Sequence, residues 1–150
     1  MRFMSVVAVV ALVLPQAVMP QSARAQDAQA LTLELNKLEP VAAANGAGPG
    51  CRAYLVTNDP EGGPKFDALR LDLVLFGTDG VIARRIALDV GPVSPGRTQV
   101  RPFELRDVAC DSLGQILVND ALICKVGGAD QTDCLDRVKT ASRVSTKLVR

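Results

Sequence analysis

The chain has 150 residues, with 17 lysines and arginines against 16 aspartates and glutamates, one tyrosine, and no histidine or tryptophan. The missing histidine excludes Ser-His-Asp and Cys-His catalysis, histidine general bases, and histidine-ligated copper or zinc. The near-neutral charge and the scarcity of aromatic side chains argue against a nucleic-acid partner. We therefore expect neither a cofactor nor a nucleic-acid ligand.

The first 25 residues predict a secretory signal peptide. Arg2 precedes an apolar stretch over residues 4–14, and Ala23-Arg24-Ala25 supplies small residues at both cleavage positions. The apolar stretch falls short of the ~20 residues that a membrane span needs, so we do not expect an uncleaved anchor. Cleavage after Ala25 leaves one domain, residues 26–150, which we expect to be soluble in the periplasm and to have no membrane span.

Seven segments of the exported part predict short β-strands, because apolar residues alternate along them between clusters of turn-forming residues. The clearest is ALRLDLVLF, in which Leu69, Leu71, Leu73 and Leu75 share one face. Pro102 cannot donate a ladder hydrogen bond, which predicts an edge strand or a bulge. The predicted strands cover residues 31–38, 51–58, 68–76, 81–90, 98–105, 114–124 and the second half of 135–150.

This pattern predicts an all-β protein, an antiparallel β-sandwich of about seven strands. No helical stretch of ordinary length separates the strands, so a parallel α/β sheet is not expected. The first half of the last segment is compatible with a short helical turn near Leu135–Lys139.

The sequence LVLFGTDGVI resembles the nucleophile loop of haloacid-dehalogenase-type phosphatases, which follows an apolar strand. Those enzymes need a carboxylate at the first position of the loop, and this chain has Gly77 there, which cannot form a phosphoenzyme. Both flanking segments also alternate with the period of a strand. Residues 77–80 are therefore predicted to form a hairpin turn, in which glycine and aspartate tolerate a positive φ.

Arg84 and Arg85 are adjacent on a predicted strand, so their side chains point to opposite faces of the sheet. One of them must lie on the core side or at its rim, where an arginine needs a carboxylate partner. Asp72 and Asp89 are the candidate partners, and an ion pair at the rim with its head group in water is the simplest arrangement.

Four cysteines lie in the exported part, and an even number in an oxidising compartment predicts two disulfides. The alternative, a zinc site, usually needs two cysteines separated by two to four residues, and no pair has that spacing. Sequence spacing alone leaves all three possible pairings open. The four residues are Cys51, Cys110, Cys124 and Cys134.

The end of the chain carries two charged features. Asp130, Asp133 and Asp136 crowd one loop, which could supply oxygen ligands to calcium or form a solvated acidic turn. Beyond that loop, the basic residues share one face if the segment is extended, and they either protect an edge strand from aggregation or contact an anionic partner. These basic residues are Arg137, Lys139, Arg143 and Lys147.

Residues 51–122 resemble the FxLYD-type domains of exported bacterial proteins, and the chain as a whole resembles small exported proteins of Alphaproteobacteria. The matching positions are Asn58, Leu73, Leu75, Phe76, Asp79, Gly80, Pro95 and Gly96, although Gly77 and the four cysteines depart from the pattern. The resemblance implies an immunoglobulin-like strand order and no chemistry. In that order strand 51–58 pairs with strand 98–105, which implies the disulfides Cys51–Cys110 and Cys124–Cys134.

We expect a non-enzymatic interaction or assembly module of the periplasm, which contacts another envelope protein through an exposed edge or through the basic C-terminal residues. The alternative is a protein that binds calcium or a small ligand with the loop Asp130–Asp136. A hydrolase built on carboxylates alone ranks last, because no carboxylate pair has a defined spacing and no catalytic residue is identified.

Overall fold

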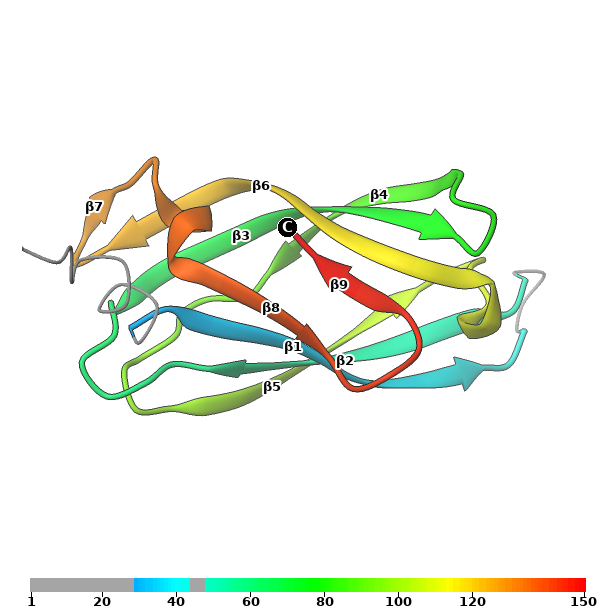
Figure 1. Ribbon diagram of the computed structural model, residues 1–150, viewed down its shortest axis with the longest axis horizontal. Helices are drawn as coiled ribbons and strands as arrows, with labels where there is room; N and C mark the ends of the chain where they lie inside the picture. Colours follow the sequence, from blue (N-terminus) through cyan, green and yellow to red (C-terminus); the bar gives the residue numbers. More distant parts are fainter. Residues whose placement is uncertain (1–28, 44–47) are drawn as a thin grey trace, which may run out of the picture.

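Two facing β-sheets make up the part of the chain that the computed structural model describes, residues 29–43 and 48–150 (Figure 1). The predicted signal peptide, residues 1–25, lies outside the described residues. No helix of the described part is long and apolar enough to cross a membrane. The strands are β1 (Leu31–Val41), β2 (Gly50–Asn58), β3 (Phe66–Gly77), β4 (Ile82–Asp89), β5 (Thr98–Leu105), β6 (Leu113–Val126), β7 (Ala129–Asp130), β8 (Val138–Ser142) and β9 (Lys147–Val149), with short 3-10 helices η1 (Cys110–Ser112) and η2 (Cys134–Arg137).

The four-stranded sheet has the strand order β5-β2-β1-β8. Strand β2 pairs antiparallel with both β1 and β5, and Cys51 of β2 lies opposite Leu105 of β5. Strand β8 pairs parallel with β1, with Val138 opposite Leu31. Strand β5 therefore lies at an edge of the sheet, which confirms the prediction made from Pro102.

The five-stranded sheet has β4 at one edge, followed by β3 and β6. The far side of β6 is shared by two short strands: β9 pairs parallel with Gln115–Leu117, and β7 pairs antiparallel with Lys125 and Val126. Two of the four register shifts between β3 and β6 leave Asn119 and Leu122 of β6 without a partner position on β3. Such bulges turn side chains in directions that a regular strand does not allow.

The core between the sheets comes from the alternation seen in the sequence. Leu31, Leu33 and Leu35 of β1 share one core cluster with Leu71 and Leu73 of β3, and the side chains of all five are fully buried. Burying each leucine stabilises the fold by about 1.5–3 kcal/mol relative to an exposed side chain. Residues between them point to the outer face of each sheet because successive side chains of a strand alternate.

All seven predicted strands are present, and the chain is all-β with two disulfides. The structure adds β7 and β8, and it corrects the prediction of purely antiparallel pairing, since β8 and β9 are parallel to their neighbours. The last segment begins with the helix η2 and then contributes one strand to each sheet. The immunoglobulin-like strand order implied by the FxLYD resemblance stays a prediction.

Both predicted disulfides are confirmed. Cys51 is bonded to Cys110, with their Cα atoms 4.9 Å apart, and Cys124 is bonded to Cys134, with their Cα atoms 6.3 Å apart. The first bond links β2 to η1, just beyond the end of β5. The second links β6 to η2, so each sheet has a covalent link close to one end.

Candidate functional site

The sharp turn that joins β3 to β4 is held by its own backbone and by one carboxylate. The N–H of Gly77 donates to the carbonyl of Val81 at 2.8 Å, and the N–H of Gly80 donates to the carbonyl of Gly77 at 3.0 Å. The N–H of Val81 donates to Oδ1 of Asp79 at 3.0 Å. Gly80 has a φ of 79°, a conformation that favours glycine. The predicted hairpin turn is therefore confirmed, in an antiparallel pair of strands.

Strand β4 is the edge of the five-stranded sheet, and its register shows which backbone groups are open. The N–H of Val90 donates to the carbonyl of Leu69 at 2.8 Å, in the same register that pairs residues 84–89 of β4 with β3. Hydrogen bonding alternates along an antiparallel pair, so from Arg84 onward the even-numbered residues of β4 direct their N–H and C=O groups to β3; a register shift between Leu75 and Phe76 reverses the alternation at Ile82. Within the described part of the chain no strand pairs with the other side, where the N–H and C=O groups belong to Arg85, Ala87 and Asp89.

The side chain of Arg85 is held in place by a buried carboxylate on β3. Asp72 is 3% exposed although it lies on the outer face of the sheet. Arg85 donates to it twice, from Nε at 2.6 Å and from Nη2 at 2.7 Å. Asn119, at one of the β6 bulges, donates to the same carboxylate at 2.7 Å. The Arg85 guanidinium lowers the pKa of Asp72 against the opposing effect of burial, and Asn119 lowers it further.

Arg84 points to the core side of the sheet, as one of the two arginines had to do. Its partner is Asp107, 3.9 Å away at the rim, rather than Asp72 or Asp89, and this corrects the predicted pairing. Asp107 lies in the loop after β5 and has a φ of 57°; it also accepts a hydrogen bond from the N–H of Gly48 at 2.9 Å. That loop is distant from β4 in sequence, so the periodicity of β4 could not indicate that Asp107 is the partner of Arg84.

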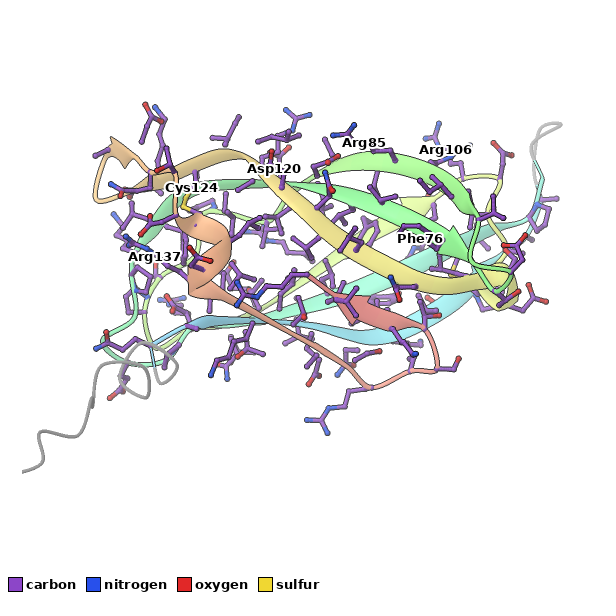
Figure 2. The ribbon with its side chains drawn as sticks, turned by 45° about the horizontal axis from the view of Figure 1, so that its top comes forward. Phe76, Arg85, Arg106, Asp120, Cys124 and Arg137 are labelled. Carbon is purple, nitrogen blue, oxygen red and sulfur yellow. A yellow bond between two sulfur atoms is a disulfide. The ribbon has the colours of Figure 1, made fainter. Side chains whose placement is uncertain are left out.

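Apolar side chains lie at the start of the open edge. Val81 is 62% exposed and Ile82 is 60% exposed, and Ile82 lies opposite Phe76 of β3. Figure 2 shows Phe76 near the turn, and Arg85 and Asp120 further along the outer side of the five-stranded sheet. The open edge of β4 thus combines unpaired backbone, an anchored arginine and exposed apolar side chains.

The outer face of the four-stranded sheet is different, because its polar side chains satisfy one another. The hydroxyl of Tyr54 donates to Glu39 at 2.7 Å, and Lys37 lies 5.4 Å from the centre of the Tyr54 ring. Arg52 donates to Glu104 of the edge strand β5 at 2.7 Å. These hydrogen bonds lower the pKa values of Glu39 and Glu104. This face has the character of a solvated surface.

The basic residues near the C-terminus do not lie on one strand. Arg137 belongs to η2 and donates to Asp133 at 2.7 Å, while Arg143 lies in the turn after β8 and donates to Glu34 at 2.9 Å. Lys139 is on β8 and Lys147 is on β9, in different sheets. The shared face of a single extended segment is therefore not formed, because the segment divides between the two sheets. A partner-binding role for these residues stays a prediction.

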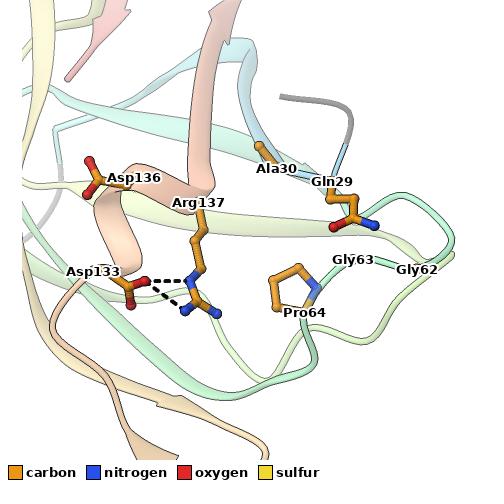
Figure 3. A pocket seen from close by; sticks show the side chains of 8 residues that line it. All are labelled: Gln29, Ala30, Gly62, Gly63, Pro64, Asp133, Asp136 and Arg137. Carbon is orange, nitrogen blue, oxygen red and sulfur yellow. Dashed lines mark hydrogen bonds and ion pairs between the residues drawn. The ribbon is translucent and has the colours of Figure 1, made fainter. Parts of the chain in front are cut away.

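Two of the three aspartates of the acidic loop line an open pocket of about 660 Å³ beside η2 (Figure 3). Each of the three has a basic neighbour: Asp133 accepts from Arg137, and Asp130 and Asp136 lie 3.6 Å and 3.8 Å from Lys125 and Arg150. The hydrogen bond from Arg137 lowers the pKa of Asp133. Among the described residues no three acidic, cysteine or histidine side chains converge on a possible metal position. This arrangement does not favour calcium.

Asp59 is a feature that the sequence analysis missed. It is 1% exposed, and neither carboxylate oxygen has a hydrogen-bond partner among the described residues. The carboxylate packs against Gly63, where a Cβ atom would lie 2.2 Å from Oδ1. Burial raises the pKa of Asp59. The segment NDPEGGP reads only as a turn in the sequence, because turn-forming residues do not reveal whether a carboxylate is buried.

No family model matches the chain, and neither a curated protein nor a solved structure matches it. The resemblance to FxLYD-type domains therefore stays a prediction, and only the geometry of the chain itself points to a function.

Proposed function

We propose that the protein is a non-enzymatic interaction module of the periplasm, which binds a β-strand of another envelope protein along the open edge of β4. The observation that carries the proposal is the row of unpaired backbone groups at Arg85, Ala87 and Asp89. An unpaired edge is a template for an additional strand, and several peptide-binding domains use this mode of recognition. The periplasmic location depends on the predicted signal peptide.

Side chains along β4 would add specificity to the backbone hydrogen bonds. Val81 and Ile82 offer apolar contacts at one end of the edge, where their exposure supports a role in binding. Arg85 is preorganised by its two hydrogen bonds to Asp72, which reduces the entropy lost when it contacts a partner. A bound strand with a carboxylate opposite Arg85 fits this edge best.

A pull-down from periplasmic extract tests the proposal. Ala87→Pro removes one outward N–H and places a ring on the open edge, so we expect it to lose the partner captured by the wild type. Ala87→Val is the matched control, since valine keeps the N–H and favours a strand. Equal capture by the proline variant would contradict binding along β4.

A third variant, with Arg137, Lys139, Arg143 and Lys147 replaced by glutamine, tests the other predicted surface. We expect this variant to capture the same partner as the wild type. Loss of the partner in the glutamine variant, together with its retention in Ala87→Pro, would assign binding to the basic C-terminal residues instead.

A further inference from the structure

We infer that the open edge of β4 also accepts β4 of a second copy of this chain. The two β4 strands pair antiparallel about a two-fold axis through Ala87. This inference rests on the proposed function in one respect, that the edge of β4 is a binding surface. It adds that the edge is complementary to itself, so that the five-stranded sheets of two copies form one continuous sheet.

The outward-facing backbone groups limit the possible registers. From Arg85 to Asp89 the odd-numbered residues carry the open N–H and C=O groups, so in a symmetric antiparallel pair they must face one another. An axis through Arg85 would place two arginines directly opposite each other, which is destabilising. An axis through Ile86 would place Arg85 opposite Ala87, with no charge contact.

An axis through Ala87 places Arg85 of each copy opposite Asp89 of the other. Facing residues of opposite charge stabilise an antiparallel pair, and the symmetry produces this contact twice. Each of the facing pairs can also exchange both backbone hydrogen bonds. On the core side, Ile86 lies opposite Leu88, which continues the apolar row along the joined sheet.

The two charged side chains are available for this contact. Arg85 uses Nε and Nη2 to bind Asp72, and Nη1 makes no hydrogen bond within the described part of the chain. The side chain of Asp89 is 73% exposed, and its contact with Arg70 is long, at 3.8 Å. Arg85 is thus fixed on one side and open on the other, while Asp89 has capacity for a closer partner.

Cysteine cross-linking of the exported chain tests the register directly. In the inferred dimer the Cα atoms of the two Ala87 residues lie about 5.5 Å apart, within the range of a disulfide. Ala83 is the matched control, because its two copies lie roughly 27 Å apart at the rise of a β-strand. All native cysteines are in disulfides, so each variant has one new thiol. We expect Ala87→Cys to form a covalent dimer under mild oxidation and Ala83→Cys to form none.

Sedimentation equilibrium supplies a second readout. It is carried out at roughly 0.1 mM protein, because small interfaces bind with low affinity. We expect the wild type to dimerise, and Asp89→Arg to raise the dissociation constant about tenfold by placing like charges opposite each other. Asp111→Arg makes the same charge change on the exposed η1 and should dimerise like the wild type.

The outcomes separate the two proposals. A monomeric wild type, or equal cross-linking of Ala83→Cys and Ala87→Cys, would overturn self-pairing; if Ala87→Pro still abolished the periplasmic pull-down, the proposed function would stand. A dimer that resists both Asp89→Arg and Ala87→Pro would show that association uses another surface. If Ala87→Pro also left the pull-down unchanged, both proposals would fail.

Discussion

Two edge strands of this molecule, β4 and β5, differ in the backbone hydrogen-bond donors that they expose to solvent. On β5 the hydrogen bond from the N–H of Asp59 to the carbonyl of Arg97 sets the alternation, so that the backbone of Thr98, Val100, Pro102 and Glu104 faces outward. Pro102 has no N–H, and it lies within this open row. On β4 every outward residue keeps its donor. The same sandwich thus blocks one edge and leaves the other able to accept a strand.

The two edges also differ in how their buried carboxylates are satisfied. Asp72, on β3 beside β4, is bound by Arg85 and Asn119. Asp59, at the end of β2 beside the start of β5, has no hydrogen-bond partner among the described residues. A side chain of β4 is thus held by the neighbouring strand β3 while the backbone on the other side of β4 is open, an arrangement suited to a rigid binding edge.

The largest expected effect concerns the covalent link beside β5. Replacing Cys51 and Cys110 with alanine opens a loop of 59 residues, and replacing Cys124 and Cys134 opens one of 10 residues. Chain-entropy estimates give losses of about 4 and about 3 kcal/mol in the free energy of unfolding. Urea unfolding of both variants measures the order. A larger loss from the shorter loop would show that native-state interactions, rather than loop length, control the effect.

The next effect tests which backbone groups of β4 face outward. Ile86→Pro removes an N–H that bonds to β3, and we expect a loss of about 1–3 kcal/mol in the free energy of unfolding. Ala87→Pro removes an outward N–H and should cost clearly less. Thermal and urea unfolding of the two variants provide the measurement, and equal losses would mean that the alternation along β4 is assigned wrongly.

Arg85→Gln should destabilise the protein in a pH-dependent way. The pKa of Asp72 is below its usual 3.8 in the folded protein, so the pair contributes stability above that pH and the contribution disappears as the pH falls through the folded pKa. We expect the melting temperature to fall by a few degrees at pH 7 and the difference to shrink below pH 3.8. Arg84→Gln, whose contact with Asp107 is long, is the control and should change less. A pH-independent loss from Arg85→Gln would exclude the charge pair as its cause.

The smallest expected effect is a gain in stability. Burial raises the pKa of Asp59 above 3.8, so the ionised carboxylate destabilises the folded state at neutral pH. Asp59→Asn removes this charge in the same volume, and we expect a gain of about 1 kcal/mol at pH 7. The gain should vanish near pH 3, where the acid is protonated in both states. Calorimetry at the two pH values measures it, and a loss at pH 7 would indicate that the carboxylate binds a group in solution.

Much of the fold was predictable because it depends on local pattern. Leu69, Leu71 and Leu73 revealed the inner face of β3 by their spacing, and Pro102 revealed an edge strand by its missing N–H. The division of the last segment between β8 and β9 was not predictable. Its sparse apolar residues are compatible with a strand, but they do not determine which sheet the strand joins. Of the candidate site, the sequence predicts the turn at 77–80 and offers Asp72 as one of two partners for an arginine of β4. The contact of Arg84 with Asp107 was not predictable, because Asp107 lies in a loop distant in sequence.

The sequence by itself determined seven of the strands, their buried faces, the turn before β4 and the presence of two disulfides, because alternation, turn chemistry and cysteine number are properties of short segments or of composition. Only the tertiary structure decided that β4 has a free side, that Asp72 is bound and that Asp59 is not. Burial and pairing of these groups depend on residues far away along the chain, and the same aspartate can lie in water or in the interior according to what folds against it.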